Sequence, residues 1–87
     1  MVFVVEIVEL GDIIKVGAVF GGDGKIRPVW FAWRGRRLAV ERVNYVWQER
    51  DGAVRIYHYA VKVGGAVYEM ALDSSRFTWR LLRSYVE

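Results

Sequence analysis

The sequence predicts an all-β protein, a small antiparallel barrel or roll close to the SH3-like barrels, with six to seven strands. Turn signals such as Asp51-Gly52 and Gly64-Gly65 recur between apolar runs, and glycine supplies the positive φ that tight hairpins need. The runs themselves are rich in Val, Ile, Tyr, Phe and Trp, which favour strands. None of them shows the period of about 3.6 residues that an amphipathic helix requires.

The first part of the chain contains three predicted strands. Residues 2–9 and 13–20 are rich in Val and Ile, and Gly11-Asp12 lies between them as a turn signal. Residues 26–34 alternate, and we expect the fully apolar face to point inward because the opposite face carries a charge. The inward face is Val29, Phe31 and Trp33, and the outward face is Trp30, Ala32 and Arg34.

The fourth predicted strand, residues 37–48, changes its alternation near Arg42, and the extra residue predicts a β-bulge there. Residues 53–63 and 66–72 supply the next two strands. Residues 77–86 are predicted as a closing strand because Phe, Thr and Trp favour strands, although residues 74–87 could instead form a capped helix. The expected core is Phe31, Trp33, Leu38, Val40, Tyr57, Tyr68 and Trp79.

The length of 87 residues predicts a single domain, 1–87, which buries about 64% of its surface on folding. Hydrophobic residues make up 54% of the chain. The interior of a barrel of this size holds only about 15–20 side chains, so many apolar residues must lie outside it. They are either exposed singly or gathered in a patch that binds a partner or a second copy, and the surplus predicts a homodimer.

Several classes of protein are not expected. The chain has no Cys, which excludes disulfides and is compatible with a cytoplasmic protein. No apolar run is long enough to span a membrane. The apolar N-terminus lacks a basic segment and is interrupted by Glu6, Glu9 and Asp12, so we expect no signal peptide.

Residues suited to catalysis are few. His58 is the only His, and Ser74 and Ser75 lie in a turn signal without an evident base. We expect Glu41 and Glu69 to pair with neighbouring arginines, for which Arg42, Arg55 and Arg80 are available. No cluster has metal-ligand spacing, and Gly21-Gly22-Asp23-Gly24-Lys25 lacks the phosphate-loop pattern. The sequence therefore predicts no enzyme, no metal and no cofactor.

Basic residues are the strongest functional signal in a chain of net charge +3. Arg34, Arg36 and Arg37 cluster on one predicted turn, Lys25 and Arg27 precede them, and Arg80 and Arg83 lie on the closing strand. Trp30 and Trp47 are the aromatic residues that could face outward beside these cations. Cations around an aromatic ring are typical of proteins that bind single-stranded DNA or RNA. The alternative is a solvated turn that prevents the sheet edges from pairing. We therefore expect a binding module for nucleic acid or, as the second possibility, for a protein partner through an aromatic face or strand edge.

A longer motif also points to a link with nucleic acid. It is Pro28-x-x-Phe31-x-Trp33-Arg34-Gly35-Arg36, then Val40, Trp47, Arg55-x-Tyr57, Gly65-x-x-Tyr68-Glu69 and Trp79-x-Leu81-x-Arg83-x-Tyr85. This pattern resembles a small uncharacterised bacterial domain family, over roughly residues 13–87. A related domain occurs at the C-terminal end of translesion polymerase homologues of the Y family. The resemblance implies a link to DNA repair or replication, and it brings no site residues with it.

Overall fold

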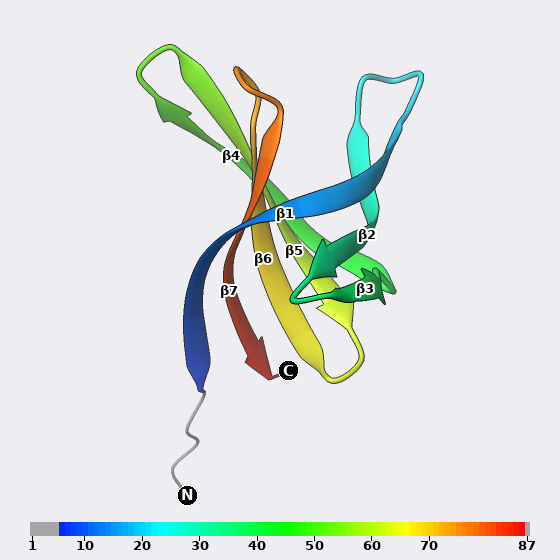
Figure 1. Ribbon diagram of the computed structural model, residues 1–87. Helices are drawn as coiled ribbons and strands as arrows, with labels where there is room; N and C mark the ends of the chain where they lie inside the picture. The colour runs from blue at the N-terminus through cyan, green and yellow to red at the C-terminus, as the bar shows by residue number, and fades with distance from the viewer. Residues whose placement is uncertain (1–5, 87) are drawn as a thin grey trace, which may run out of the picture.

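The computed structural model describes residues 6–86, and this part of the chain contains strands and turns but no helix. The seven strands are β1 (Ile7–Phe20), β2 (Ile26–Trp33), β3 (Arg36–Ala39), β4 (Arg42–Asp51), β5 (Val54–Val63), β6 (Ala66–Asp73) and β7 (Thr78–Val86) (Figure 1). All pairings are antiparallel, in the order β3-β2-β1-β7-β6-β5-β4. The predicted all-β fold is confirmed. Within residues 6–86, no helix could cross a membrane.

Strand β1 joins the two parts of the sheet because it is long enough to pair with two strands. Its first part, from Ile7 to Ile14, pairs with β7, and its last part, from Lys15 to Phe20, pairs with β2. In Figure 1, β1 runs across the other strands and carries β2 and β3 over to one side. The single sheet therefore curls into a roll rather than lying flat.

The structure corrects the first two predicted strands, which form one continuous strand of 14 residues. Glu9 pairs with Arg83 and Asp12 with Leu81, so β1 contains one residue more than β7 between these two pairs. Gly11-Asp12 therefore marks a β-bulge and not a turn, because β7 continues alongside on both sides of it. Residues 2–5 of the predicted first strand lie outside the described residues.

The predicted strand 37–48 is also divided differently, into β3 and β4 with a junction at Val40 and Glu41. The Val40 amide donates to the Val29 carbonyl at 2.9 Å, and the Glu41 amide donates to the Lys62 carbonyl at 2.9 Å. The chain thus changes partners here, from β2 to β5. The irregularity expected at Arg42 lies next to it, between Val43 and Tyr45. This junction ties the two ends of the sheet together at one point.

The core is formed by the inner face of the roll. Its buried members are Ile14, Phe31, Tyr59, Val61, Met70 and Leu81. Among the seven expected core residues, Phe31 is fully buried, and the other six are half-buried and pack against this cluster. Trp33 remains near the surface because its indole Nε1 donates to Asp12 Oδ2 at 2.8 Å.

The prediction for the inward face of β2 is correct for Phe31 and needs one correction at Val29. The pairing with β1 shifts between Gly17 and Ala18, and this shift leaves Val29 without a directly opposite residue on β1. As a result Pro28 is buried in the core, whereas Val29 is only half-buried.

The closing segment is strand β7, so the helical alternative for residues 74–87 is wrong. Asp73 Oδ1 accepts hydrogen bonds from the Ser75 amide at 2.9 Å and the Ser75 hydroxyl at 2.6 Å. These hydrogen bonds lower the pKa of the Asp73 carboxyl and fix a tight turn. The turn brings the chain back as a strand instead of starting a helix.

We expect Phe31→Ala to lower the free energy of unfolding by about 3–5 kcal/mol, because it empties the centre of a small core. Chemical denaturation measures this loss. Phe20→Ala is the matched control, since Phe20 is 66% exposed and Phe31 is 0% exposed. The control should cost less than about 0.5 kcal/mol. Equal losses in both variants would contradict the assigned core.

Candidate functional site

The turn between β2 and β3 presents the predicted arginine cluster. Arg34 has φ of 50° and Gly35 has φ of 73°, and a two-residue type I′ hairpin turn needs positive φ at both positions. This tight turn leaves Arg34, Arg36 and Arg37 exposed. Among residues 6–86, none of the three forms an ion pair with a carboxylate. Three guanidinium groups therefore face solvent with their charges uncompensated.

Two of these guanidinium groups stack on indole rings. The Arg37 Cζ atom lies 3.9 Å from the centre of the Trp30 ring, and the Arg34 Cζ atom lies 4.4 Å from that of Trp33. Such cation–π contacts hold the flat face of a guanidinium while its N–H edges remain available as donors. Trp30 and Trp33 thus orient Arg37 and Arg34.

Trp30 itself is held against the backbone of β1. Gly17 is its cross-strand partner, and a Cβ atom placed on Gly17 would lie 2.0 Å from the Trp30 Nε1 atom. The indole therefore lies across the glycine and is half-buried, with Arg37 stacked on it. Trp30 is outward-facing as predicted. In this structure, however, it supports Arg37 and does not present an uncovered ring.

Strand pairing adds further cations beside this hairpin. Lys15 pairs with Ala32, which pairs with Arg37, so the two cations flank one small residue. On the other side of β1, Arg80 pairs with Ile13. Cross-strand neighbours lie about 5 Å apart at Cβ and diagonal ones about 7–8 Å apart. We call the resulting surface the basic face: Lys15, Arg37 and Arg80 on the strands, with Arg34 at the adjoining turn. Arg36 pairs with Trp33, so it lies beside this face and its side chain leaves the other side of the hairpin.

Lys15 was not predicted as a site residue, whereas Arg80 was considered both as a partner for a glutamate and as a cation near the arginine turn. Their place in the basic face depends on the order β7-β1-β2-β3, which no local pattern indicates. Alternation along β1 would have placed Lys15 on the same face as Ile13, and this was the only local signal.

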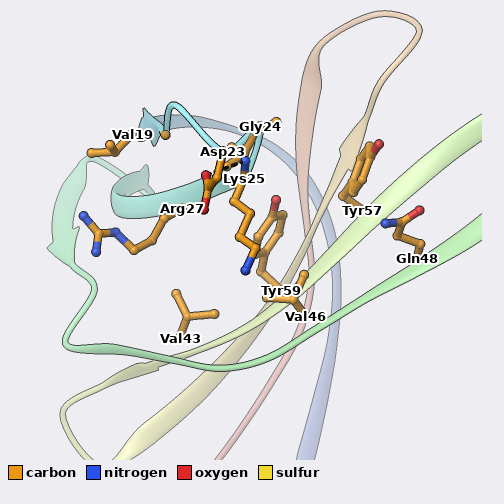
Figure 2. A pocket seen from close by; sticks show the side chains of 12 residues that line it. Val19, Asp23, Gly24, Lys25, Arg27, Val43, Val46, Gln48, Tyr57 and Tyr59 are labelled. Atoms are coloured by element: carbon orange, nitrogen blue, oxygen red, sulfur yellow. Dashed lines mark hydrogen bonds between the residues drawn. The ribbon is translucent and has the colours of Figure 1, made fainter.

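Lys25 does not join the basic face. It precedes β2 while Arg34 follows it, and β2 is eight residues long, so about 26 Å of strand separates them. Lys25 lines a cleft of about 750 Å³ between the β1–β2 hairpin and strands β4 and β5 (Figure 2). The predicted set of five site residues is thus divided between two surfaces.

The residues weighed for catalysis have structural surroundings. His58 is 8% exposed, stacks on Trp47 with ring centres 5.1 Å apart, and has its Nε2 atom 3.3 Å from Glu49 Oε2. Glu69 pairs with Arg83 at 3.1 Å, and not with the arginines named from the sequence. This hydrogen bond raises the pKa of Arg83. Glu41 instead accepts a hydrogen bond from the Gly64 amide. No group of three or more His, Cys, Asp and Glu residues within 6–86 could hold a metal ion.

Comparison with protein-family models, curated proteins and solved structures gives no significant match. The resemblance to the bacterial domain family and to the polymerase-associated domain therefore stays a prediction.

We expect Gly17→Ala to displace Trp30, because the new Cβ atom would overlap the indole. Overpacking of this kind costs about 1–3 kcal/mol of stability, which thermal denaturation detects. Gly22→Ala is the matched control, since its Cβ atom would have nothing within 4 Å. A Gly17 variant as stable as the control would show that the indole does not lie on Gly17.

Proposed function

We propose that the protein is a non-enzymatic module that binds single-stranded DNA or RNA through its basic face. The observation that carries this proposal is the group of exposed guanidiniums at the β2–β3 turn, which have no carboxylate partner among residues 6–86. Unpaired surface cations attract the phosphates of a nucleic acid and release its counterions on binding. A role as an accessory in DNA repair or replication is the specific form that the family resemblance suggests.

The orientation of Arg37 supports phosphate contact in particular. Its guanidinium lies 3.9 Å from the Trp30 ring centre, which restricts the side chain before any ligand arrives. Restricting a side chain in advance lowers the entropy lost on binding. Guanidinium edges match the geometry of phosphate oxygens, and two N–H groups can donate together.

Little sequence preference is expected from this face. The described residues form strands and turns, and the cations point from a hairpin instead of lining a helix that could enter the major groove. Contacts to phosphates carry no base information by themselves. The proposed binding is therefore modest in affinity and strongly dependent on salt.

Fluorescence anisotropy with a labelled single-stranded oligonucleotide across a salt series tests the proposal. Three phosphate contacts on a single strand give a slope of log K against log salt of about −2. We expect the triple variant Arg34→Ala, Arg36→Ala, Arg37→Ala to bind at least about tenfold more weakly at low salt and to lose most of this slope.

The charge-matched control is Arg50→Ala, Arg55→Ala, Arg76→Ala, which removes three exposed arginines away from the basic face: two on strands β4 and β5 near their connecting turn, and one in the β6–β7 turn. Its binding and salt slope should stay close to those of the parent. If both triple variants weakened binding equally, the net charge of the protein, and not the position of the arginines, would account for the binding. No binding by the parent at low salt would contradict the proposal.

A second candidate function, self-association, is favoured by the edge of β4. Within residues 6–86 this strand has a neighbour on one side only, β5, and Tyr45 and Val46 on it are 71% and 57% exposed. An exposed edge strand with apolar side chains is a template for pairing with another strand. A homodimer formed through β4 would explain why these two apolar side chains are exposed in the single chain.

Light scattering after size-exclusion chromatography tests this second candidate. A dimer through β4 has twice the chain mass of 10.1 kDa at high concentration. Tyr45→Lys should return it to the monomer mass, because a lysine on an edge strand opposes pairing. The control is Phe77→Lys, which places a lysine at another exposed site. Tyr57→Lys cannot serve as the control, because Tyr57 packs on the core. A monomer at every concentration would exclude self-association.

A further inference from the structure

The cleft that contains Lys25 is a surface distinct from the basic face. One wall is the β1–β2 hairpin with Val19, Lys25, Ile26 and Arg27, and the other is formed by strands β4 and β5. Figure 2 shows Val43 at its lower end and Tyr57 and Gln48 at its far side. No strand pairing joins β2 to β4 across it. The roll is thus tied at the Val40–Glu41 junction but open along the cleft.

Apolar side chains of the inner face are uncovered in this cleft. Val46 pairs with Tyr59, a buried core residue that is 2% exposed, yet Val46 itself is 57% exposed. On the opposite wall Ile26, which packs against the core cluster, is only half-buried. Inner-face residues of a small barrel are normally covered by the facing strand. The cleft is therefore a part of the interior that the protein does not fill with its own side chains.

The charge in the cleft is predominantly positive. Lys25 extends from the hairpin toward Tyr59 and Val46 (Figure 2). Neither Lys25 nor Arg27 forms an ion pair with residues 6–86. Among residues 6–86, Asp23 is the one carboxylate that lines the cleft, and its Oδ1 atom accepts a hydrogen bond from the Lys25 amide at 3.0 Å. The cleft thus has two cations and one carboxylate, and the carboxylate already accepts a hydrogen bond. This balance of charge favours the binding of an anion in the cleft.

Tyr59 adds a neutral polar group. Burial raises the pKa of its hydroxyl, and the neighbouring Tyr57 raises it further. Tyr59 therefore stays protonated at neutral pH, adds no negative charge to the cleft, and can donate a hydrogen bond.

We propose that this cleft binds a small organic anion with an aromatic or branched apolar body and one carboxylate or phosphate group. The apolar body lies against Val46 and Tyr57, and the anionic group contacts Lys25. A volume of about 750 Å³ is within the range of ligand sites, which are mostly apolar with a few placed polar groups. The proposal does not depend on the nucleic-acid proposal, because it uses a different surface.

Two fluorescent probes of the same shape test it: anilinonaphthalene sulfonate, and N-phenylnaphthylamine, which lacks the sulfonate. We expect Lys25→Met to weaken binding of the anionic probe about tenfold, as loss of a charge-assisted contact does, and to leave the neutral probe within about twofold. Lys15→Met is the matched control, since it removes the same charge from the basic face, and it should leave both probes unchanged. Val46→Thr should weaken both probes, because it makes the apolar wall polar.

Displacement of the anionic probe then identifies the ligand class. Competition by phenyl phosphate supports a phosphate ligand, and competition by benzoate supports a carboxylate ligand. Equal competition by benzyl alcohol would overturn the proposal, as would anionic-probe binding that Lys25→Met leaves unchanged. Matching thermal unfolding of the Lys25 variant and the parent ensures that the comparison is between folded proteins.

Discussion

Two backbone hydrogen bonds, at Val40 and Glu41, hold the two ends of the curled sheet together. One residue bonds to β2 and the next bonds to β5, each at 2.9 Å, so strands from opposite ends of the sheet are fixed near each other. Glu41 reinforces the junction by accepting a hydrogen bond from the Gly64 amide. Val43, two residues beyond the junction, packs against the core and also lines the cleft, so the filled core and the open cleft adjoin at this point.

The position of β1 explains why the cations gather. Because β1 pairs with β7 along one part and β2 along the other, side chains from both ends of the chain reach one surface. Lys15 and Arg80 approach the arginine turn only through this shared strand. Elsewhere on the sheet Arg83 is paired with Glu69 and Glu9, so its charge is compensated locally. The contrast between arginines with and without a carboxylate partner among residues 6–86 is what distinguishes the basic face.

Local signals in the sequence predicted much of the fold but not its connections. Turn residues and β-favouring runs predicted strands and the closing strand β7, and the adjacency of Arg34, Arg36 and Arg37 predicted one exposed turn. Gly11-Asp12 was misread as a turn because a bulge and a turn use the same residues, and only the partner strand distinguishes them. The cleft could not be predicted, since it depends on the distance between hairpins that are far apart in the sequence.

The pairing of β1 with β7 has a consequence for how the chain is made. Ile7 lies beside Tyr85, so the first half of β1 cannot form its hydrogen bonds to β7 until β7, the last strand, is present. During synthesis on the ribosome, the hairpin of β1 and β2 can form early, but the roll is completed only after β7 has emerged. Folds dominated by such distant pairings form slowly. Loss of the final strand would leave the apolar inner face of the nascent chain open to aggregation.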